Sequence, residues 1–487
     1  MRTYIKQASE HDYSDLANLL FPEKVKSLEE IIAKYPDRNL PKGAMVTRIA
    51  PSPTGFANIG MVYAGLINKK LSLQSKGVFF LRIEDTDKKR EQEGATKLIV
   101  DTLREMDIEV DEGVTSETQE TGDYGPYTQS KRNDIYHAFV YDLVRRGLAY
   151  PCFCTTGELE KHHYEQEEQK VRFGYYKDWA VWRNKTRDEI NEALSVGKEF
   201  VIRLKSQGDF SNKVTFNDII KGEIEFPQND NDTVLLKSDM TPTYHLAHAI
   251  DDFLMKTTHV IRGDEWVSSV PLHIELHTVL GFSLPEYGHI APICISENGA
   301  GKRKLSKRKD KEASMNYFFE KGYPTLSVTD YLLNLANSNY EEWREKNVNT
   351  SWKDFSFDIE KLKESNAPLF SEVKLQDISK GILSRMEAGE FYDNILGWAN
   401  NCHEGCKVVL TFDKPYWIRV FSIERDPLKP RKDFAYYSDV PMQYMYFNKM
   451  MFLDYHWNEQ SFALSKKERI SFLKKFIANC NIEWKKY

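Results

Sequence analysis

After about 44 residues, the chain alternates between short apolar runs and longer stretches with helical periodicity. Residues 46–50 and 78–83 are apolar and β-prone, which is typical of strands buried on both faces. Residues 61–73 have the pattern of a helix between them, and Ala95, Ile99 and Met106 share one face of another. Strands that alternate with helices predict a doubly wound parallel sheet.

The pattern changes twice further along the chain. Between about 151 and 230, strand candidates such as residues 200–204 lie among charged helices, which indicates an insertion. Strand signals return at 233–236 and 259–261, whereas the helices beyond Lys311 are amphipathic and rich in aromatic residues. We therefore predict an α/β fold: a Rossmann-type parallel sheet split by an α+β insertion and followed by a mostly α-helical C-terminal domain.

Composition narrows the class of protein. The 487 residues are 41% hydrophobic and 29% charged with both signs mixed, which suits a soluble protein of about three domains. No apolar run reaches the ~18 residues of a membrane span, and the N-terminus has no signal-peptide core. Six scattered cysteines predict reduced thiols, so we expect a cytoplasmic protein without membrane contact. The net charge of −6 argues against a generally basic nucleic-acid coat, but a local basic face remains compatible with it.

The first candidate for chemistry is the segment 48–61, which includes Ala-Pro-Ser-Pro-Thr-Gly at 50–55 and Asn-Ile-Gly-Met at 58–61. A strand ends there, a turn follows, and a helix begins at about Asn58 to Gly60. The free N–H groups of a helix N-terminus bind phosphate, and Gly60 lets a nucleotide approach the backbone. An ordinary strand–turn–helix connection is the alternative.

Three further segments carry charged groups. Arg-Ile-Glu-Asp-Thr-Asp at 82–87 follows a strand, where a parallel sheet has its ligand crevice; the alternative is an acidic turn that caps a helix. Tyr244 and His248 are four residues apart and share a helical face, and Arg262 follows a strand-like run. The basic run 302–309 after two glycines suits a mobile clamp on a pyrophosphate, although charge runs are usually solvated faces.

Together these segments resemble the glutamyl-tRNA synthetases, class I aminoacyl-tRNA synthetases, over residues 15–440. The resemblance rests on 50–55, 82–87, 242–266 and Lys-Leu-Ser-Lys-Arg at 304–308, in the family's order, and points to a bacterial branch with a short N-terminal extension. It implies an N-terminal extension (1–44), a Rossmann catalytic domain in two halves (45–123 and 233–301), an acceptor-stem-binding insertion (124–232), a stem-contact region with the Lys-Leu-Ser-Lys-Arg loop (302–386) and a shortened helical anticodon-binding region (387–487).

The resemblance also implies a reaction and its residues. ATP and glutamate form glutamyl-adenylate, and the 3′-terminal adenosine of a tRNA accepts the glutamyl group. The residues expected around glutamate are Arg48, Ala50, Ser52, Glu84, Tyr244, His248 and Arg262. Those expected at ATP, or acting on the reacting phosphate, are Asn58, Gly60, Glu265, Lys304 and Lys307. Magnesium is expected to arrive with ATP, the tRNA to be tRNA-Glu with tRNA-Gln left open, and the enzyme to be a monomer.

Two places where the sequence departs from the family pattern change these expectations. Asn58 and Met61 replace both histidines of the family's His-Ile-Gly-His motif, so a degenerate paralogue that binds tRNA or an amino acid without charging tRNA is the rival hypothesis. Cys152 and Cys154 keep the spacing of a zinc-binding pair, but residues 175–184 contain no cysteine. We therefore expect no structural zinc, because such sites close with four ligands.

Overall fold

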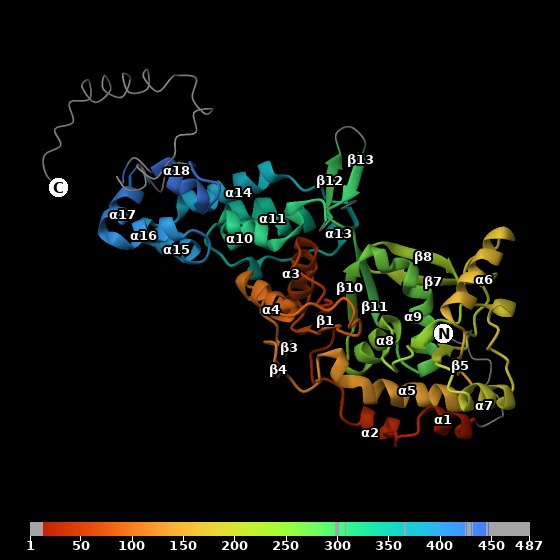
Figure 1. The fold of residues 1–487 in the computed structure, drawn as a ribbon. Helices are drawn as coiled ribbons and strands as arrows, with labels where there is room; N and C mark the ends of the chain where they lie inside the picture. Colours follow the sequence, from red (N-terminus) through yellow and green to blue (C-terminus); the bar gives the residue numbers. More distant parts are fainter. Residues whose placement is uncertain are drawn as a thin grey trace, which may run out of the picture. The chain divides into compact units, whose positions relative to one another are not determined.

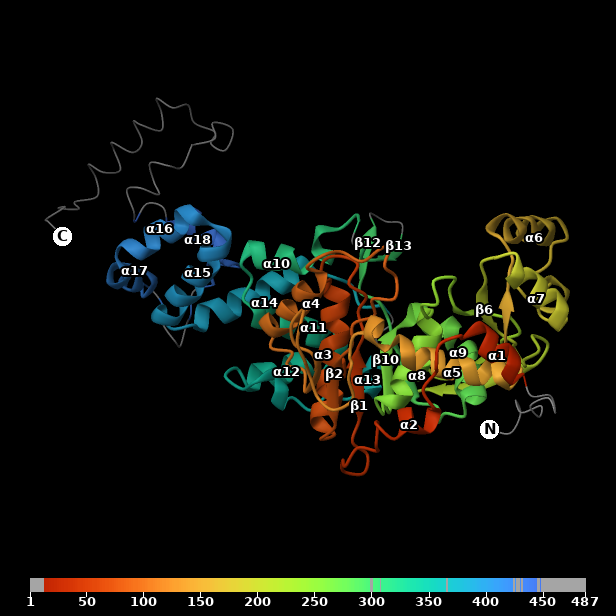
Figure 2. The same ribbon diagram turned by 60° about the horizontal axis from the view of Figure 1, so that its bottom comes forward.

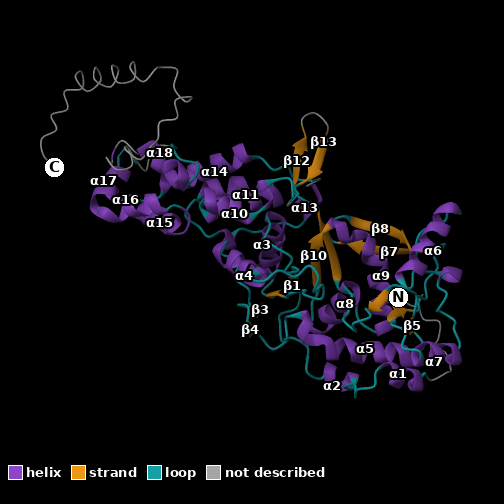
Figure 3. Cartoon of the chain, in the orientation of Figure 1, coloured by secondary structure: helices purple, strands orange, loops and turns teal. Residues whose placement is uncertain are grey.

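The computed structural model describes residues 13–297, 301–306, 308–364, 367–423, 425, 430, 432–444 and 447. The described residues form two compact units, one from Met1–Phe318 and Thr325–Leu375 and the other from Phe319–Pro324 and Gln376–Tyr487. All the described strands belong to the first unit (Figures 1 and 3). No described helix combines the length and the apolar character that a membrane span requires.

The first sheet is built from the alternating pattern at the start of the chain. Strands β1 (Val46–Ile49), β2 (Val78–Leu81) and β3 (Glu112–Val114) are parallel, and β4 (Glu120–Thr121) adds an antiparallel edge. Helix α3 (Ile59–Gln74) joins β1 to β2, and α4 (Ala95–Glu105) joins β2 to β3. The side chains of Phe79, Phe80 and Leu81 are at most 1% exposed, as the continuous apolar run predicts.

A second sheet lies beside β1. Its order is β10 (His259–Gly263), β11 (Glu286–Ile290), β7 (Lys213–Asp218) and β8 (Gly222–Pro227), and β10 and β11 are parallel. The N–H of Thr258 donates to the carbonyl of Val46 at 3.0 Å, and the Asn68 amide donates to the carbonyl of Ile261 at 3.1 Å. These bonds hold β10 next to β1 and α3, which confirms the predicted Rossmann-type core (Figure 1).

The predicted insertion contains a third sheet. Strands β5 (Ala149–Cys152), β6 (Val201–Leu204) and β9 (Val234–Leu236) pair antiparallel, and α6 (Thr156–Glu168) and α7 (Arg187–Ser195) come between β5 and β6 in the chain (Figure 2). The predicted boundary between 232 and 233 does not separate the sheets. β9 pairs with β6 of the insertion, whereas β7 pairs with β11 of the catalytic core. Apolar periodicity locates strands but does not identify their partners.

The remaining elements are mostly helical. Helix α1 (Ser14–Leu20) lies near α5 (Asn133–Arg145), where the ring of Phe21 meets that of Tyr141. The other elements of the first unit, or shared with the second, are α2 (Leu28–Ile32), α8 (Tyr244–Leu254), α9 (Val270–Leu280), the hairpin β12 (Cys294–Glu297) and β13 (Gly301–Lys304), α10 (Met315–Lys321), α11 (Thr325–Ala336), α12 (Tyr340–Lys346), α13 (Glu360–Glu364) and α14 (Glu372–Arg385).

The second unit has its own helical core. Its elements beyond α14 are α15 (Ala388–Cys402), α16 (Glu404–Phe412), α17 (Lys414–Phe421) and α18 (Val440–Tyr444). Phe391, Ile395 and Trp417 are at most 1% exposed and belong to one apolar cluster. The expected helical C-terminal part is therefore present, and no strand follows β13 in the described chain (Figure 3).

Candidate active site

A buried carboxylate on α8 joins the ends of β1 and β2. Asp252 accepts a hydrogen bond from Arg82 at 2.7 Å and one from Nδ1 of His248 at 2.8 Å, and Nε of Arg48 lies 3.4 Å away. All four side chains are at most 4% exposed. Burial opposes ionisation of Asp252, but Arg48, Arg82 and His248 together hold its pKa well below the usual range. Asp252 is therefore a fixed anion that orients three neighbours.

Glu84 lies at the edge of the same network. Its Oε1 accepts from Arg82 at 2.9 Å, and its backbone N–H donates to the carbonyl of Pro51 at 3.1 Å. The second bond places the segment 82–87 directly beside the turn 50–55, as expected if both line one crevice. Burial raises the pKa of Glu84, although the charges of Arg82 and Arg48 act in the opposite direction. A buried carboxylate of this kind gains from a cationic ligand.

Arg262, at the end of β10, has only neutral acceptors around it. Its donors face the Tyr244 hydroxyl at 3.3 Å, Nε2 of His289 at 3.1 Å, Nδ1 of His273 at 3.2 Å and Nε2 of His248 at 3.5 Å. Burial lowers the pKa of His248 and of His273 well below the usual value, so both rings are neutral.

The charge of Arg262 is consequently not balanced by direct contact. Arg262 is 6% exposed, and within the described residues it makes no ion pair with a carboxylate. The buried arginines Arg48, Arg82 and Arg132 differ, since each contacts Asp251 or Asp252. A buried cation without a counter-ion is costly, so the geometry favours an anionic ligand at Arg262.

Asn58 has a structural task at the start of α3. Its Oδ1 accepts from the N–H of Met61 at 2.9 Å, so it is the N-cap of the helix. A Cβ at the exposed Gly60 would lie 3.1 Å from that Oδ1, which is closer than an ordinary van der Waals contact. A glycine at this position therefore leaves room for the capping oxygen. The amide N–H₂ of Asn58 is left beside the N-terminus of a 16-residue helix, where an anion is stabilised.

The basic run forms part of the β12–β13 hairpin and the loop after it. Arg303 makes two bonds to Asp310, at 2.5 and 2.7 Å, and Asp310 also accepts from the N–H of Ser306 at 2.8 Å. Nζ of Lys304 lies 3.1 Å from Oε1 of Glu265, and both side chains are about half exposed. Lys307, the other lysine predicted to act on the phosphate, lies outside the described residues.

The predicted residues are therefore brought together to different degrees. Arg48, Glu84, Tyr244, His248 and Arg262 join one buried network, and Ala50 and Ser52 lie in the turn that Glu84 contacts. Arg82 belongs to the segment 82–87 that the sequence singles out, although no role of its own is predicted for it. The network members that the sequence does not single out for a role are Asp252, His273, His289, Asp218 and, in the loop, Asp310. Among these, only Asp252 carries a local signal, because it lies four residues after His248 on one helix.

The Cys152–Cys154 pair lies against a tyrosine. The Tyr175 hydroxyl is 3.3 Å from Sγ of Cys152 and 3.4 Å from Sγ of Cys154. The hydrogen bond from Cys154, opposed by burial, lowers the pKa of the Cys152 thiol to about 5. Across the described chain, no group of three or more His, Cys, Asp or Glu side chains is placed to hold a metal ion. These residues do not make a four-ligand zinc site, and the absence of zinc stays a prediction.

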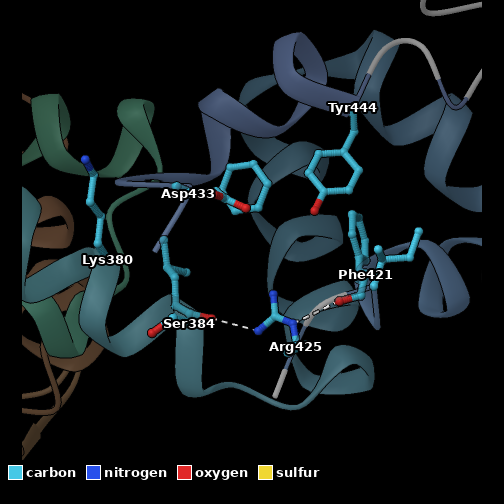
Figure 4. Close-up of a pocket in the computed structure, with 9 residues that line it drawn as sticks. Lys380, Ser384, Phe421, Arg425, Asp433 and Tyr444 are labelled. Atoms are coloured by element: carbon cyan, nitrogen blue, oxygen red, sulfur yellow. Dashed lines mark hydrogen bonds between the residues drawn. The ribbon is translucent and has the colours of Figure 1, made fainter. Parts of the chain in front are cut away.

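A cavity in the second unit does not contain any predicted site residue. Figure 4 shows Arg425 inside it, donating to the carbonyl oxygens of Leu383 at 2.8 Å and Phe421 at 2.9 Å. Its volume of about 20 Å³ is room for about one water molecule. Arg425 thus ties helix ends together, and the cavity is too small for an amino acid.

Known proteins match the chain over most of its length. The model of the catalytic domain of class I tRNA synthetases (E and Q) matches residues 44–366. A glutamate–tRNA ligase of Clostridium perfringens strain 13 is 47% identical over 440 residues, which are 90% of this chain and 80% of that protein. One of Clostridium beijerinckii is 44% identical over 473 residues, 97% of this chain and 85% of that protein.

Solved structures agree with this assignment. The crystal structure of a glutamate tRNA ligase from Elizabethkingia meningosepticum in complex with its amino acid has a TM-score of 0.68 and 25% identity, and the match covers 90% of this chain and 87% of that one. The matched family region contains β1, α3, β2, α8 and β10, which carry the buried network. The chain belongs to the class I tRNA synthetases of the glutamate and glutamine type.

Proposed function

We propose that this protein is a glutamate–tRNA ligase, which activates glutamate with ATP and transfers it to the 3′-terminal adenosine of tRNA. The observation that carries the proposal is the buried Arg262, whose close neighbours are neutral acceptors. A ligand carboxylate at this guanidinium supplies the missing negative charge and gains strong, charge-assisted bonds. Two carboxylates and one ammonium in glutamate match a site that offers Arg48, Arg262 and the buried Glu84.

The amino-acid side of the site follows from these charges. Arg48 and Arg262 bind the two carboxylates of the substrate glutamate, and Glu84 binds its ammonium group. Tyr244 and His248 hold the side chain of the substrate in place. Ala50 and Ser52 form the turn that closes over the ligand. The substrate carboxylate is already a nucleophile, so activation requires no enzymic base, and positioning and charge stabilisation supply the rate.

The phosphate side uses the start of α3 and the basic loop. Asn58 and the backbone around Gly60 face the α-phosphate of ATP, Glu265 faces the adenosine, and Lys304 and Lys307 stabilise the leaving pyrophosphate. Magnesium arrives with ATP and is coordinated mainly by its phosphates. Each of these groups acts on charge that grows as pyrophosphate leaves.

We further infer which segment of the chain binds which part of the tRNA. Residues 124–232 bind the acceptor stem, 302–386 contact the stem, and 387–487 bind the anticodon. The substrate is tRNA-Glu, and charging of tRNA-Gln is decided by the assay below. The enzyme acts in the cytoplasm as a monomer.

Aminoacylation with labelled glutamate tests the proposal, using tRNA-Glu and tRNA-Gln side by side. Arg262→Lys keeps the charge but loses the planar fork, so we expect the KM for glutamate to rise about tenfold to hundredfold. Arg172→Lys is the matched control, because Arg172 pairs with Asp230 in the insertion. Attachment of another amino acid in preference to glutamate, or equal KM values for the two variants, would contradict the proposal.

A further inference from the structure

Asp218, at the end of β7, is buried against a histidine of the neighbouring strand. Its Oδ1 accepts three backbone N–H groups, from Ile220 at 2.9 Å, Lys221 at 2.9 Å and His289 at 3.2 Å. Its Oδ2 lies 2.5 Å from Nδ1 of His289, and the side chains of both residues are fully buried. Because β7 pairs with β11 at Asp218, the sheet itself fixes this contact.

These bonds determine which nitrogen of His289 carries its proton. Burial lowers the pKa of His289, although Asp218 opposes that shift, so the ring has one proton to place. A carboxylate only accepts, so Nδ1 must be the donor to Oδ2, and Nε2 is left bare. Nε of Arg262 is 3.1 Å from Nε2, and a guanidinium only donates. Both contacts therefore require the same tautomer.

We propose that Asp218 is a positioning residue for glutamate recognition: it fixes the tautomer of His289, which in turn orients the Arg262 guanidinium. The proposal rests on the assignment of Arg262 to a glutamate carboxylate. By sequence Asp218 lies in the predicted insertion, but its strand β7 belongs to the sheet that also contains β10 and β11, so Asp218 lies within reach of the amino-acid site.

The substitution Asp218→Asn reverses the tautomer by the geometry of the site. Three backbone N–H groups continue to require an oxygen at the Oδ1 position, so the new N–H₂ group must face Nδ1 of His289. Nδ1 then becomes the acceptor, and Nε2–H points at the N–H of Arg262. Two donors in contact repel, so the guanidinium moves from its place.

Steady-state aminoacylation separates positioning from a general loss of structure. For Asp218→Asn we expect the KM for glutamate to rise about tenfold or more with the KM for ATP unchanged, by analogy with the loss that follows when a partner orienting a metal-binding histidine is removed. Asp230→Asn is the matched control, since Asp230 is a buried aspartate of the same insertion that pairs with Arg172. In a His289→Gln background, Asp218→Asn should add less than threefold, because the histidine through which it acts is gone.

A direct measurement keeps the proposal testable even if Asp218→Asn does not fold. In ¹⁵N-histidine-labelled wild-type protein, the His289 signals, identified by their loss in His289→Gln, should show the Nδ1–H tautomer. An Nε2–H tautomer there would overturn the proposal. So would a normal glutamate KM in folded Asp218→Asn while Arg262→Lys raises it, a result that leaves the proposed function standing. An unchanged glutamate KM in Arg262→Lys would instead remove the proposed function itself.

Discussion

Asn58 caps a helix in the fold and, in the proposed function, also acts in the reaction. The family resemblance leads us to expect a histidine there, but Oδ1 of Asn58 caps α3 by accepting from Met61. Elsewhere in the chain a histidine performs the same capping, since Nδ1 of His403 accepts from the N–H of Cys406 at 3.1 Å. An imidazole at position 58 is therefore compatible with the cap and leaves its other nitrogen for the ligand.

Three substitutions separate these two tasks of Asn58. Asn58→Ser keeps a capping oxygen but loses the amide donor, so adenylate formation should slow about 10²- to 10³-fold with little change in stability. Asn58→Ala should lose a similar rate and, in addition, about 1 kcal/mol of stability. Asn58→His should raise the activation rate without changing glutamate binding. Single-turnover adenylate formation and thermal unfolding of each variant provide the measurements.

Lys307→Ala is the comparison for this series. We expect it to lose more activity than Asn58→Ala, because in the proposed function Lys307 supplies a charged donor to the leaving pyrophosphate. A wild-type enzyme that forms no adenylate with cognate tRNA, while Asn58→His does, would show that the chain is the degenerate paralogue.

At the residue scale, the sequence revealed the residues that sit in recognisable motifs. Arg48, Glu84 and Arg262 were predicted because strand ends and family motifs mark them. Asp218 and His289 were not, because they are 71 positions apart and no sequence pattern indicates that they are in contact. Such residues act through pairs that only the folded sheet creates, and the sequence alone does not encode their distance.

Among the elements, the β12–β13 hairpin is joined to the loop that follows it by the carboxylate of Asp310. Asp310 joins the side chain of Arg303 to the N–H of Ser306, so it closes the loop that carries the Lys-Leu-Ser-Lys-Arg motif. The bonds from Arg303, opposed by slight desolvation, lower the pKa of Asp310 to about 2. The folded pKa lies below the unfolded value of about 4, so this stabilisation is present above pH 4 and is lost as pH falls toward 2.

Asp310→Asn should loosen this loop without affecting the amino-acid network. The substitution removes one of the two carboxylates that Arg303 pairs with and leaves Glu297, so kcat should fall about tenfold or more while the KM for glutamate stays constant. Asp101→Asn provides the control, because Asp101 makes only exposed ion pairs on α4. Steady-state kinetics at saturating tRNA give both constants, and a raised glutamate KM with normal kcat would refute this role.

The insertion should fold without zinc. Cys152 and Cys154 contact the Tyr175 hydroxyl, and two thiolates are short of the four ligands that close a structural site. Elemental analysis of the purified protein should find less than one tenth of a zinc ion per chain. About one zinc per chain that disappears in Cys152→Ser would show that this expectation is wrong.

Element positions were largely predictable, but their pairings were not. The strands at 46–50, 78–83 and 259–261 were expected from apolar runs, and the structure has β1, β2 and β10 there. The pairing of β7 with β11 and of β9 with β6 crosses the predicted boundaries. Strand pairing depends on which surfaces meet in three dimensions, so a change in sequence pattern does not locate it.

The two units of the whole molecule differ in their buried titratable groups. His245, His248, His273 and His277 lie in the first unit, and burial lowers the pKa of each; for His245 and His277 it falls to about 4. In an unfolded chain these rings titrate near 6.5. The unfolded state thus binds more protons between pH 6.5 and 4, and stability is lost as pH falls through that window.

Acid should therefore destabilise the first unit selectively. At pH 5, each of His245 and His277 should lower the free energy of unfolding of the first unit by about 2 kcal/mol relative to pH 7.5. Hydrogen exchange at the two pH values, corrected for the intrinsic rate, should show faster opening of α8 and α9, with α15 and α17 as the internal control. Equal changes in both units would contradict the assignment of the effect to the buried histidines.

Binding of tRNA should depend steeply on salt despite the net charge of −6. Phosphates must meet local basic clusters such as 302–311 and 429–432, of which only part is described. If six to ten phosphates are neutralised, affinity should fall about 10³- to 10⁵-fold between 50 and 200 mM salt. Lys309→Gln should lower the salt slope by about one, whereas Lys97→Gln, on α4, should leave it unchanged. Filter binding measures the slope, and a flat salt response would refute the prediction.

The contact between Lys304 and Glu265 has a consequence for how much of the enzyme is ready to receive ATP. Both side chains are assigned to the nucleotide, yet in this structure they face each other at 3.1 Å. We therefore expect two populations, one with Lys304 and Glu265 paired and one with them apart, of which only the second offers both groups to ATP. An exposed ion pair is worth only about 0.2–1 kcal/mol, so pairing of the two side chains weakens the apparent ATP affinity by a factor of about 2 to 6. Glu265→Gln would remove the ion pair while leaving an amide for the adenosine. A lower dissociation constant for ATP in that variant would therefore show that the ion pair competes with nucleotide binding.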